Sequence, residues 1–257
     1  MIPAAPGSPH LPACVDHLPS APAVYVVCEA DPQLGTHVPV APEAGFAARA
    51  NAGLAAAHAD GHTAALLLND DTEVQPGALE ALASGLCRSR IVGAVLEHWG
   101  GGVQQAGLRV SRRSGRVVAR TTDPRSADQA VDAVGGAALA LDLSLWSALG
   151  GFDERYLFYF EDVDLCLRAA ARGVRPLVIG GARVRHRGGG TRSHHSPEAA
   201  HHLGRSHTLL VRSLPGGPLA TSLRLATVVG AGALWTSRSV GIRGLVPFGR
   251  GVLEGLT

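Results

Sequence analysis

The sequence contains no lysine, so its 23 basic residues other than histidine are all arginines. Aromatic residues make up only 4% of the chain, and the arginines are not interleaved with them, which argues against a surface that stacks nucleic-acid bases. The 257 residues are 46% hydrophobic, which is enough for a sizeable buried core. We therefore expect one large globular domain, or one domain with an appendage, and no nucleic-acid partner.

Cysteine is scarce as well, and no two cysteines have C-x-x-C spacing. The four lie far apart and mostly within apolar stretches, at Cys14, Cys28, Cys87 and Cys166. This pattern favours buried free thiols in a reducing compartment over a disulfide framework or a zinc site. The first ten residues, MIPAAPGSPH, have no basic segment followed by an apolar one, so no secretory signal is predicted. The cytoplasm is the expected location.

The carboxyl-terminal part of the chain lacks a long hydrophobic run. Its apolar stretch LATVVGAGALW (residues 225–235) has about half of the roughly 20 residues that a membrane span needs. Residues 183–257 hold ten arginines and two acidic residues, a net charge of +8, whereas residues 1–182 hold 13 arginines and 19 acidic residues, a net charge of −6. An apolar segment among arginines fits peripheral contact with an anionic membrane and fits equally well a core helix with a solvated basic face.

Strand and helix patterns alternate in the first half of the chain. AVYVVCEAD (23–31) is an apolar β-rich run, and residues 45–61 are helix formers closed by a glycine, which is typical of α/β proteins. Ala64 to Leu68 predict a buried strand, followed by an acidic turn, Asn69 to Glu73, and a helix that begins near Pro76. The carboxylates therefore follow the carboxyl end of a strand, where open α/β sheets bind ligands. Residues 111–130 are polar and aperiodic, and we expect a surface loop there.

A second acidic cluster lies in GGFDERYLFYFEDVDLCLRAAARG (150–173). Apolar residues at Val163, Cys166, Leu167 and Ala170 have the spacing of an amphipathic helix, which Gly173 would close. Glu161, Asp162 and Asp164 then lie in its first turn, where capping and the helix dipole also favour acidic residues. Two acidic clusters, each after an apolar segment, supply what a divalent cation and a separate general base require.

Three segments carry a resemblance to a known family. LLLNDDTEV (66–74), the 150–173 segment and ARVRHRGGGTRS (182–193) resemble, in order and spacing, the family 2 glycosyltransferases, particularly the rhamnosyltransferase-like inverting enzymes. The resemblance covers about residues 11–213. It implies an α/β GT-A fold, a Rossmann-like mixed sheet flanked by helices, in one domain over residues 1–213, followed by a basic helical extension over 214–257. It also implies Mg²⁺ or Mn²⁺, a nucleotide-diphosphate sugar donor, and a glycan or lipid-linked acceptor.

The resemblance also assigns residues to roles. Asp71, with Asp70 beside it in the turn that starts at Asn69, would bind the cation that holds the donor diphosphate. His186 matches a histidine of the same metal and phosphate region. Asp162 matches the catalytic base that takes the proton of the acceptor hydroxyl, and Glu161 is a reserve candidate. Direct displacement needs only one base and one stabiliser of the leaving group.

Neighbouring residues have less specific assignments. Gly135 and Gly136 resemble the small residues that let the sugar approach the backbone, although a tight turn explains them equally well. Phe158 and Phe160 would raise the pKa of the base by desolvation, or anchor their loop in the core. Arg168 lies one helical turn after Asp164, and we interpret it as a structural partner of that residue.

The sequence departs from the family pattern near its start. MIPAAPGSPH makes a poor strand, so the first strand of the fold is expected to be lost or replaced, or to lie upstream of Met1. The second strand ends in Cys28 and Glu29 where the family usually has an Asp-Asn pair, which leaves Glu29 or Asp31 as the donor contact.

Other functions remain open on these residues. A metal-dependent phosphotransferase or nucleotidyltransferase would use the same acidic clusters, and a degenerate glycosyltransferase would keep the fold as a binding or scaffold protein. A second metal site is less favoured, because zinc-site spacings are not met. Its candidate ligands are His194, His195, His201, His202 and His207.

Overall fold

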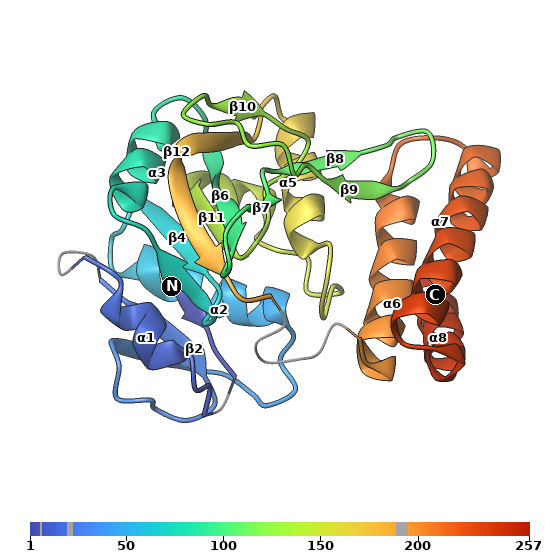
Figure 1. Cartoon of the computed structure of the whole chain (residues 1–257), viewed down its shortest axis with the longest axis horizontal. Helices are drawn as coiled ribbons and strands as arrows, with labels where there is room; N and C mark the ends of the chain where they lie inside the picture. Colours follow the sequence, from blue (N-terminus) through green and yellow to red (C-terminus); the bar gives the residue numbers. More distant parts are fainter. Residues whose placement is uncertain (6, 20–22, 189–194) are drawn as a thin grey trace. The chain divides into compact units, whose positions relative to one another are not determined.

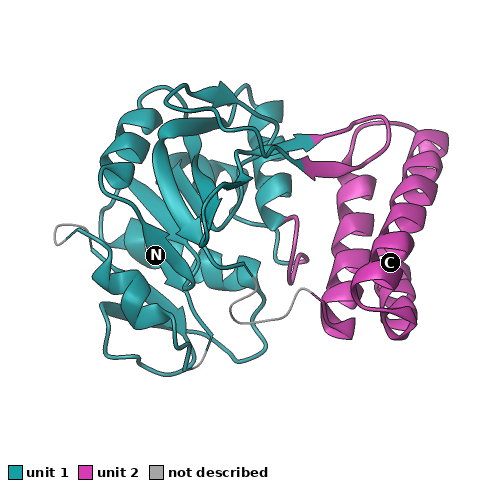
Figure 2. Ribbon diagram, viewed as in Figure 1, with its two compact units in different colours: residues 1–109, 119–154, 161–191 teal, residues 110–118, 155–160, 192–257 magenta. Residues whose placement is uncertain are grey.

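The computed structural model describes residues 1–5, 7–19, 23–188 and 195–257. Their contacts separate two compact units, which Figure 2 shows in two colours. Unit 1 comprises residues 1–109, 119–154 and 161–191, and unit 2 comprises residues 110–118, 155–160 and 192–257. The domain boundary that we expected at residue 213 does not coincide with this division, because the helix that ends there packs with the helices that follow it.

Unit 1 is built on a mixed sheet (Figure 1). Among the described residues, its main path runs in the order β10-β12-β6-β11-β4, with β5 paired to β12 and β7 paired to β6. β12 runs parallel to β6, whereas β11 is antiparallel to both β6 and β4. The strands are β4 (Ala64–Leu68), β5 (Thr72–Val74), β6 (Ile91–His98), β7 (Val103–Gln105), β10 (Gln129–Ala130), β11 (Ala138–Asp142) and β12 (Leu177–His186). The strands β8 (Leu108–Val110) and β9 (Val117–Ala119) form a separate two-stranded sheet.

A parallel three-stranded sheet adjoins the main sheet at β4. It consists of β1 (Ile2–Pro3), β2 (Tyr25–Cys28) and β3 (Thr36–Pro39). The amide of Leu68 on β4 donates to the carbonyl of Met1 at 3.0 Å, so Met1 joins the two sheets. The expectation that the first strand is lost is therefore wrong. Ile2 is fully buried, and the amide of Ala4 donates to Val27. Two paired residues around a buried side chain are enough for this strand, although prolines obscure it in the sequence.

Helices cover the sheet of unit 1. α2 (Phe46–Ala59) packs on β1 and β2, and α3 (Ala78–Leu86) packs on β12 and β6, while α1 (Leu11–Asp16), α4 (Leu143–Leu149) and α5 (Glu161–Ala171) complete the unit. The predicted helices near residues 45–61, 76–86 and 163–170 and the strand at 64–68 are confirmed. α3 lies close to the sheet because Gly85 has no side chain; a Cβ there would lie 2.6 Å from Ile179 Cδ1.

Two expectations about unit 1 are wrong. Residues 111–130 are not only a loop, since they contain β9 and β10. Strands of two or three residues are too short for alternation of apolar and polar residues to reveal them. Cys87 is exposed, whereas Cys14, Cys28 and Cys166 are buried free thiols as predicted. Cys87 follows the last turn of α3 and therefore leaves the buried face of that helix.

The described part of unit 2 contains the helices α6 (Pro197–Ser213), α7 (Pro218–Ser239) and α8 (Leu245–Leu256), and a short 3₁₀ turn, η1 (Ile242–Gly244). α6 and α8 approach closely at glycines: a Cβ on Gly251 would lie 2.0 Å from the carbonyl oxygen of His201. Within the described residues, α7 is the one helix that is long and apolar enough to cross a membrane, by length and composition alone. Its 22 residues exceed the 11-residue apolar run that we predicted to be too short, because the helix continues through polar residues on both sides of that run.

Candidate active site

The acidic turn after β4 lies against the end of β12. Thr72 on β5 is paired with His186 on β12, which brings the turn and the histidine together. Asp71 Oδ1 lies 3.3 Å from His186 Nε2, and Asn69 Nδ2 lies 3.4 Å from the same nitrogen. The amide of Arg187 donates to the carbonyl of Asp71 at 3.2 Å, which closes the arrangement from the backbone. Asp70 and Asp71 are buried. The predicted grouping of this turn with His186 is thus present in the fold.

Gln104 on β7 helps to orient the ring of His186. His186 Nδ1 lies 2.8 Å from Gln104 Oε1. An amide oxygen accepts a hydrogen bond, so this contact suits Nδ1–H as the donor and leaves Nε2 facing Asp71 and Asn69. Sequence analysis missed Gln104, because a glutamine in a short strand carries no signal of its own.

The residues of this turn fit a divalent cation. Asn69 Oδ1 is buried and has no hydrogen-bond partner, the Asp71 carboxylate lies beside Nε2 of His186, and all three residues are of types that bind such ions. The described part of the chain has no group of three or more His, Cys, Asp or Glu residues placed for a metal. Mg²⁺ commonly binds through one or two carboxylates together with water and substrate phosphates. The turn therefore fits a cation whose ligands are completed by a phosphorylated substrate.

Asp162 is held at the start of α5 by main-chain amides. Gly136 N–H donates to Asp162 Oδ2 at 2.7 Å, and Val163 N–H donates to Oδ1 at 2.7 Å. Burial raises the pKa of Asp162 above its ordinary value, although these amides stabilise the charged form and oppose the rise. The side chain is only partly enclosed, so a carboxylate with fixed orientation remains accessible.

Glu161 lies in a different environment from its neighbour. Its side chain is buried, and Oε2 has no hydrogen-bond partner. Burial, and then the charge of Asp162, raise the pKa of Glu161 well above its usual range. Of two neighbouring carboxyl groups, the one that accepts no hydrogen bonds takes up a proton more readily. Glu161 is therefore protonated more readily than Asp162, whose charged form accepts two main-chain hydrogen bonds.

A glycine segment connects the two acidic clusters. The amide of Asn69 donates to the carbonyl of Ala137 at 3.1 Å, and the preceding residue, Gly136, binds Asp162. A Cβ on Gly136 would lie 3.6 Å from Asp162 Oδ2 and 3.5 Å from the ring of Phe46, so the space over this residue is bordered by the base candidate and an aromatic ring. Gly135 has a different reason for lacking a side chain: a Cβ there would lie 2.1 Å from Gln105 Oε1.

Glu29 and Asp31, the predicted donor contacts, have local partners. Glu29 Oε1 pairs with Arg49 Nη2 at 2.5 Å, and the pKa of Glu29 is lowered because the Arg49 guanidinium outweighs the opposing effect of burial. The other oxygen of Glu29, Oε2, is buried without a hydrogen-bond partner. Arg49 also donates to the carbonyls of Ala4 and Ala44 and so links β1 to the loop before α2. Asp31 instead accepts from the amide of Gln33 in an exposed turn.

Two side chains hold the glycine-rich loop before α5. Arg168 pairs with Asp164 at 2.7 Å, as predicted, and also donates to the carbonyls of Leu149 and Gly151. Asn51 on α2 exchanges hydrogen bonds with the backbone of Phe152, accepting from its N–H at 2.8 Å and donating to its carbonyl at 2.9 Å. Sequence analysis missed Asn51, whose partner is about a hundred residues away.

The aromatic residues before Glu161 belong to unit 2. Phe160 packs on His207 with ring centroids 4.7 Å apart, and Phe158 contacts Tyr159 at 5.4 Å. Tyr159 and Phe160 have φ values of 70° and 67°, the left-handed region that non-glycine residues rarely occupy. That Phe158 and Phe160 exclude water from Asp162 stays a prediction.

The histidines of the less favoured second metal site do not form one cluster. His194 lies outside the described residues. His201 pairs with Glu254 at 3.0 Å, and His202 lies 3.8 Å from Glu198. His207 lies 2.9 Å from the carbonyl of Gly115, and burial lowers its pKa. His201 and His202 also contact each other, with ring centroids 5.4 Å apart.

Glu161 allows a prediction about stability. The folded protein keeps a proton on Glu161 at pH values where the unfolded chain has released it, so this group's contribution to stability falls as pH rises above about 4.3, by up to about 1.4 kcal/mol per pH unit, until the folded pKa is passed. Replacing Glu161 by Gln removes this dependence. In urea unfolding between pH 5 and 8, Glu161→Gln is expected to gain stability over the wild type as pH rises. Glu43→Gln, at an exposed site, should not; parallel curves for Glu161→Gln and wild type would contradict the assignment.

Known proteins resemble this chain in sequence and in fold. No protein-family model matches the sequence. Uncharacterized proteins of Mycobacterium bovis (Mb1552) and Mycobacterium tuberculosis (Rv1525) are 29% identical over 202 residues, covering 75% of this chain and 74% of theirs. Among solved structures, the mannosyltransferase PcManGT from Pyrobaculum calidifontis, in complex with GDP-Man and Mn²⁺, matches with a TM-score of 0.60 over 97% of this chain and 72% of its own, at 16% identity. The chain has the GT-A glycosyltransferase fold.

Two further structures agree with this fold. Residues 1–349 of TarS from S. aureus, in complex with UDP-GlcNAc, match with a TM-score of 0.56 and 15% identity over 98% of this chain and 80% of theirs. GalNAc-T7, solved with UDP, GalNAc and Mn²⁺, matches with a TM-score of 0.57 and 13% identity over 72% of this chain. This chain spans only 42% of the GalNAc-T7 chain. At these identities the likeness concerns the fold, and the predicted mixed sheet flanked by helices is confirmed.

Proposed function

We propose that this GT-A protein is an inverting, metal-assisted glycosyltransferase of the family 2, rhamnosyltransferase-like type. It would move a sugar from a nucleotide-diphosphate donor to a hydroxyl of a glycan or lipid-linked acceptor. The observation that carries the proposal is the orientation of the Asp162 carboxylate by the amide of Gly136. The next residue, Ala137, accepts a hydrogen bond from the amide of Asn69, which begins the turn that meets His186. The proposal is supported by solved neighbours that contain UDP, UDP-GlcNAc or GDP-Man and, in two cases, Mn²⁺.

The geometry suits a single displacement. Asp162 would accept the proton of the acceptor hydroxyl as that oxygen attacks the anomeric carbon, on the face opposite the departing diphosphate. The amides of Gly136 and Val163 hold its two oxygens and favour its charged form, whereas burial raises the pKa of Glu161 well above its usual range. Asp71, His186 and Asn69 would hold Mg²⁺ or Mn²⁺, which supplies positive charge against the charge that develops on the leaving nucleotide. Gly136 leaves room for the sugar, and Glu29 Oε2 is the unpartnered oxygen available to the donor.

Two other functions compete with this one. A phosphotransferase or nucleotidyltransferase would use the same turn but would cleave the donor within its diphosphate, so the products separate the two: a free nucleoside diphosphate indicates sugar transfer. A scaffold protein with a degenerate site would need neither an oriented carboxylate nor a buried ligand set. Both are present here, which favours an enzyme.

Donor binding is the test of this proposal. We expect one nucleotide-sugar in a panel to raise the melting temperature only when Mn²⁺ is present, with about 2.7 kcal/mol of stabilisation at a hundredfold excess over Kd. Asp71→Ala should abolish the shift, whereas Asp16→Ala, at an exposed site on α1, should retain it. If no donor produced a metal-dependent shift in the folded protein, or if Asp71→Ala kept it, the proposal would fail.

A membrane-bound acceptor is the second part of the proposal, together with a cytoplasmic location at the inner membrane face. Among the residues that the structure describes, eleven large hydrophobic side chains are exposed, and eight of them lie in the last 39 residues: Leu219, Leu223, Leu234, Trp235, Ile242, Val246, Leu253 and Leu256. Leu219, Leu223 and Leu234 share one face of α7 by helical spacing, and Arg238, Arg243 and Arg250 lie in the same part of the chain. Apolar side chains with arginines fit the interface of an anionic bilayer.

Vesicle binding tests the membrane contact. The wild type should sediment with vesicles that contain phosphatidylglycerol, and less with phosphatidylcholine alone. Leu219→Ser combined with Leu223→Ser removes two exposed leucines and should weaken binding at least tenfold, because each buried leucine contributes about 1.5–3 kcal/mol. Val118→Ser is the matched control, since Val118 is exposed outside this region. A protein that never sediments with anionic vesicles would contradict the membrane contact and leave sugar transfer untouched.

A further inference from the structure

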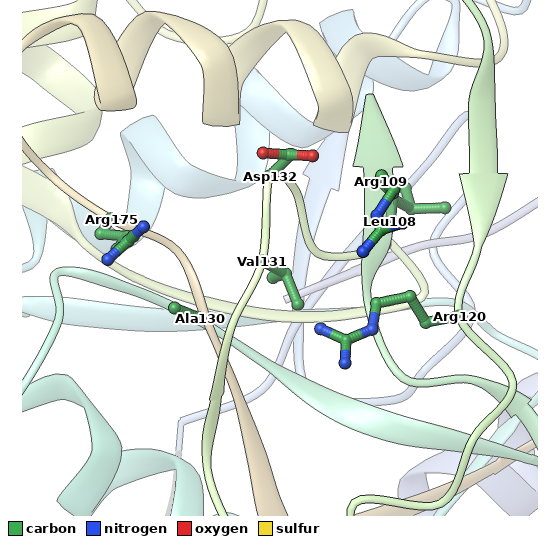
Figure 3. A pocket seen from close by; sticks show the side chains of 7 residues that line it. All are labelled: Leu108, Arg109, Arg120, Ala130, Val131, Asp132 and Arg175. Atoms are coloured by element: carbon green, nitrogen blue, oxygen red, sulfur yellow. The ribbon is translucent and has the colours of Figure 1, made fainter. Parts of the chain in front are cut away.

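A small cavity in unit 1 is lined by seven residues, three of which are arginines (Figure 3). Its volume is about 170 Å³, and four segments that are separate in the sequence form it. β8 contributes Leu108 and Arg109, the residue after β9 contributes Arg120, β10 and the residues after it contribute Ala130 to Asp132, and the segment before β12 contributes Arg175. The cavity opens beside the start of β12, whereas His186 ends that strand, so it is separate from the candidate active site.

The charges around this cavity favour an anion. Three guanidinium groups and one carboxylate line it, which leaves a local charge of +2. Three guanidinium groups around one small cavity attract an anion, and water screens this attraction at the exposed Arg109 and Arg175. In Figure 3 the guanidinium groups of Arg109 and Arg120 both point toward Val131.

Part of the cavity is fixed before any ligand arrives. Arg120 Nη2 donates to Gln129 Oε1 at 2.6 Å, so its guanidinium is held in place with other donors remaining. The approach of β8 to β10 depends on Gly107, which has φ +84°; a Cβ there would lie 2.6 Å from Val131 Cγ1 and 2.9 Å from Val178 Cγ2. A fixed guanidinium loses less freedom on binding than a mobile one, and its planar fork matches the oxygens of a phosphate.

We propose that this cavity is a binding site for a phosphate monoester group, distinct from the donor site. A dianionic phosphate matches the local charge of +2, and each guanidinium can offer two parallel N–H donors to its oxygens. The phosphate could belong to a free small molecule or to a lipid headgroup, since both present the same group. The site does not depend on the protein being a transferase.

The experiment uses the full-length protein without divalent metal, in EDTA, so that binding at the candidate active site is suppressed. Titration calorimetry with glycerol phosphate is expected to give saturable binding. Arg175→Gln and Arg120→Gln should each weaken it about tenfold or more, because hydrogen bonds to charged groups contribute that much. Arg113→Gln, at an exposed position outside the cavity, removes the same charge and should leave the affinity unchanged. The Arg175 side chain is exposed, so its variant keeps the test valid if Arg120→Gln fails to fold.

Vesicles distinguish the two sources of the phosphate. Phosphatidylcholine vesicles with phosphatidic acid present the same monoester in a membrane. Arginine-dependent binding of glycerol phosphate would support a free ligand, and arginine-dependent binding to these vesicles alone would support a lipid headgroup. The proposal is overturned if Arg120→Gln and Arg175→Gln change neither, or if Arg113→Gln loses as much affinity as they do.

Discussion

Asp162→Asn is expected to lower kcat about 10²- to 10⁴-fold, the range that a positioned general base contributes, while donor binding is retained. The substitution keeps the size of the side chain and removes its capacity to take a proton. An amide oxygen can still accept from Gly136 or Val163, so the start of α5 should persist. The measurement is steady-state sugar transfer with the donor that the thermal screen identifies.

Glu161→Gln is the matched control for this result. Because burial raises the pKa of Glu161 and so favours its neutral form, the neutral analogue should keep most of the activity. If Glu161→Gln lost activity and Asp162→Asn kept it, the base would be the buried residue and the assignment would be reversed.

The pH profile gives an independent check on Asp162. Catalysis requires the carboxylate, so kcat/KM should rise with pH and level off above the pKa of Asp162. Burial raises that pKa, and the acidic limb should therefore lie at a higher pH than for an ordinary aspartate, about 3.9. In Asp162→Asn this limb should disappear from the residual activity.

Arg224→Leu is expected to destabilise unit 2 by about 3–5 kcal/mol. Arg224 is buried in α7, and its guanidinium donates to three main-chain carbonyls: Nε to Arg112 at 2.7 Å, Nη2 to Pro215 at 2.8 Å and Nη1 to Leu214 at 3.4 Å. Leucine fills part of the volume but leaves these carbonyls without their donors. Because the partners belong to the backbone, no second substitution can remove them.

Urea unfolding measures this effect. Arg238→Leu is the matched control, since Arg238 is exposed in the last turn of the same helix, and its change should stay within about 0.5 kcal/mol. Equal midpoints for Arg224→Leu and the wild type would show that water satisfies the carbonyls and that the arginine is not needed for the packing of α7.

Most of the regular elements of unit 1 could be predicted, because their signals are local. The apolar run Ala64–Leu68, the helix formers before Gly61 and the spacing from Val163 onward each act within a few residues. β1 could not be predicted in this way, since its two residues are held by β2 and by Met1 contacts with β4. Gln104, Asn51 and Arg49 were missed for the same reason: their partners lie far away in the sequence.

The acidic residues in the first turn of α5, Glu161, Asp162 and Asp164, show which properties cannot be predicted from sequence. Its residues and their helical position follow from the sequence alone, and so does the resemblance to glycosyltransferases. The acidic character of the turn at Asn69–Asp71 is also evident from the sequence. Which carboxyl group keeps a proton depends on Gly136, 26 residues before Asp162, and on the burial of Glu161. Proton affinity is set by solvent exclusion and by nearby donors, and only the tertiary structure brings these around a side chain.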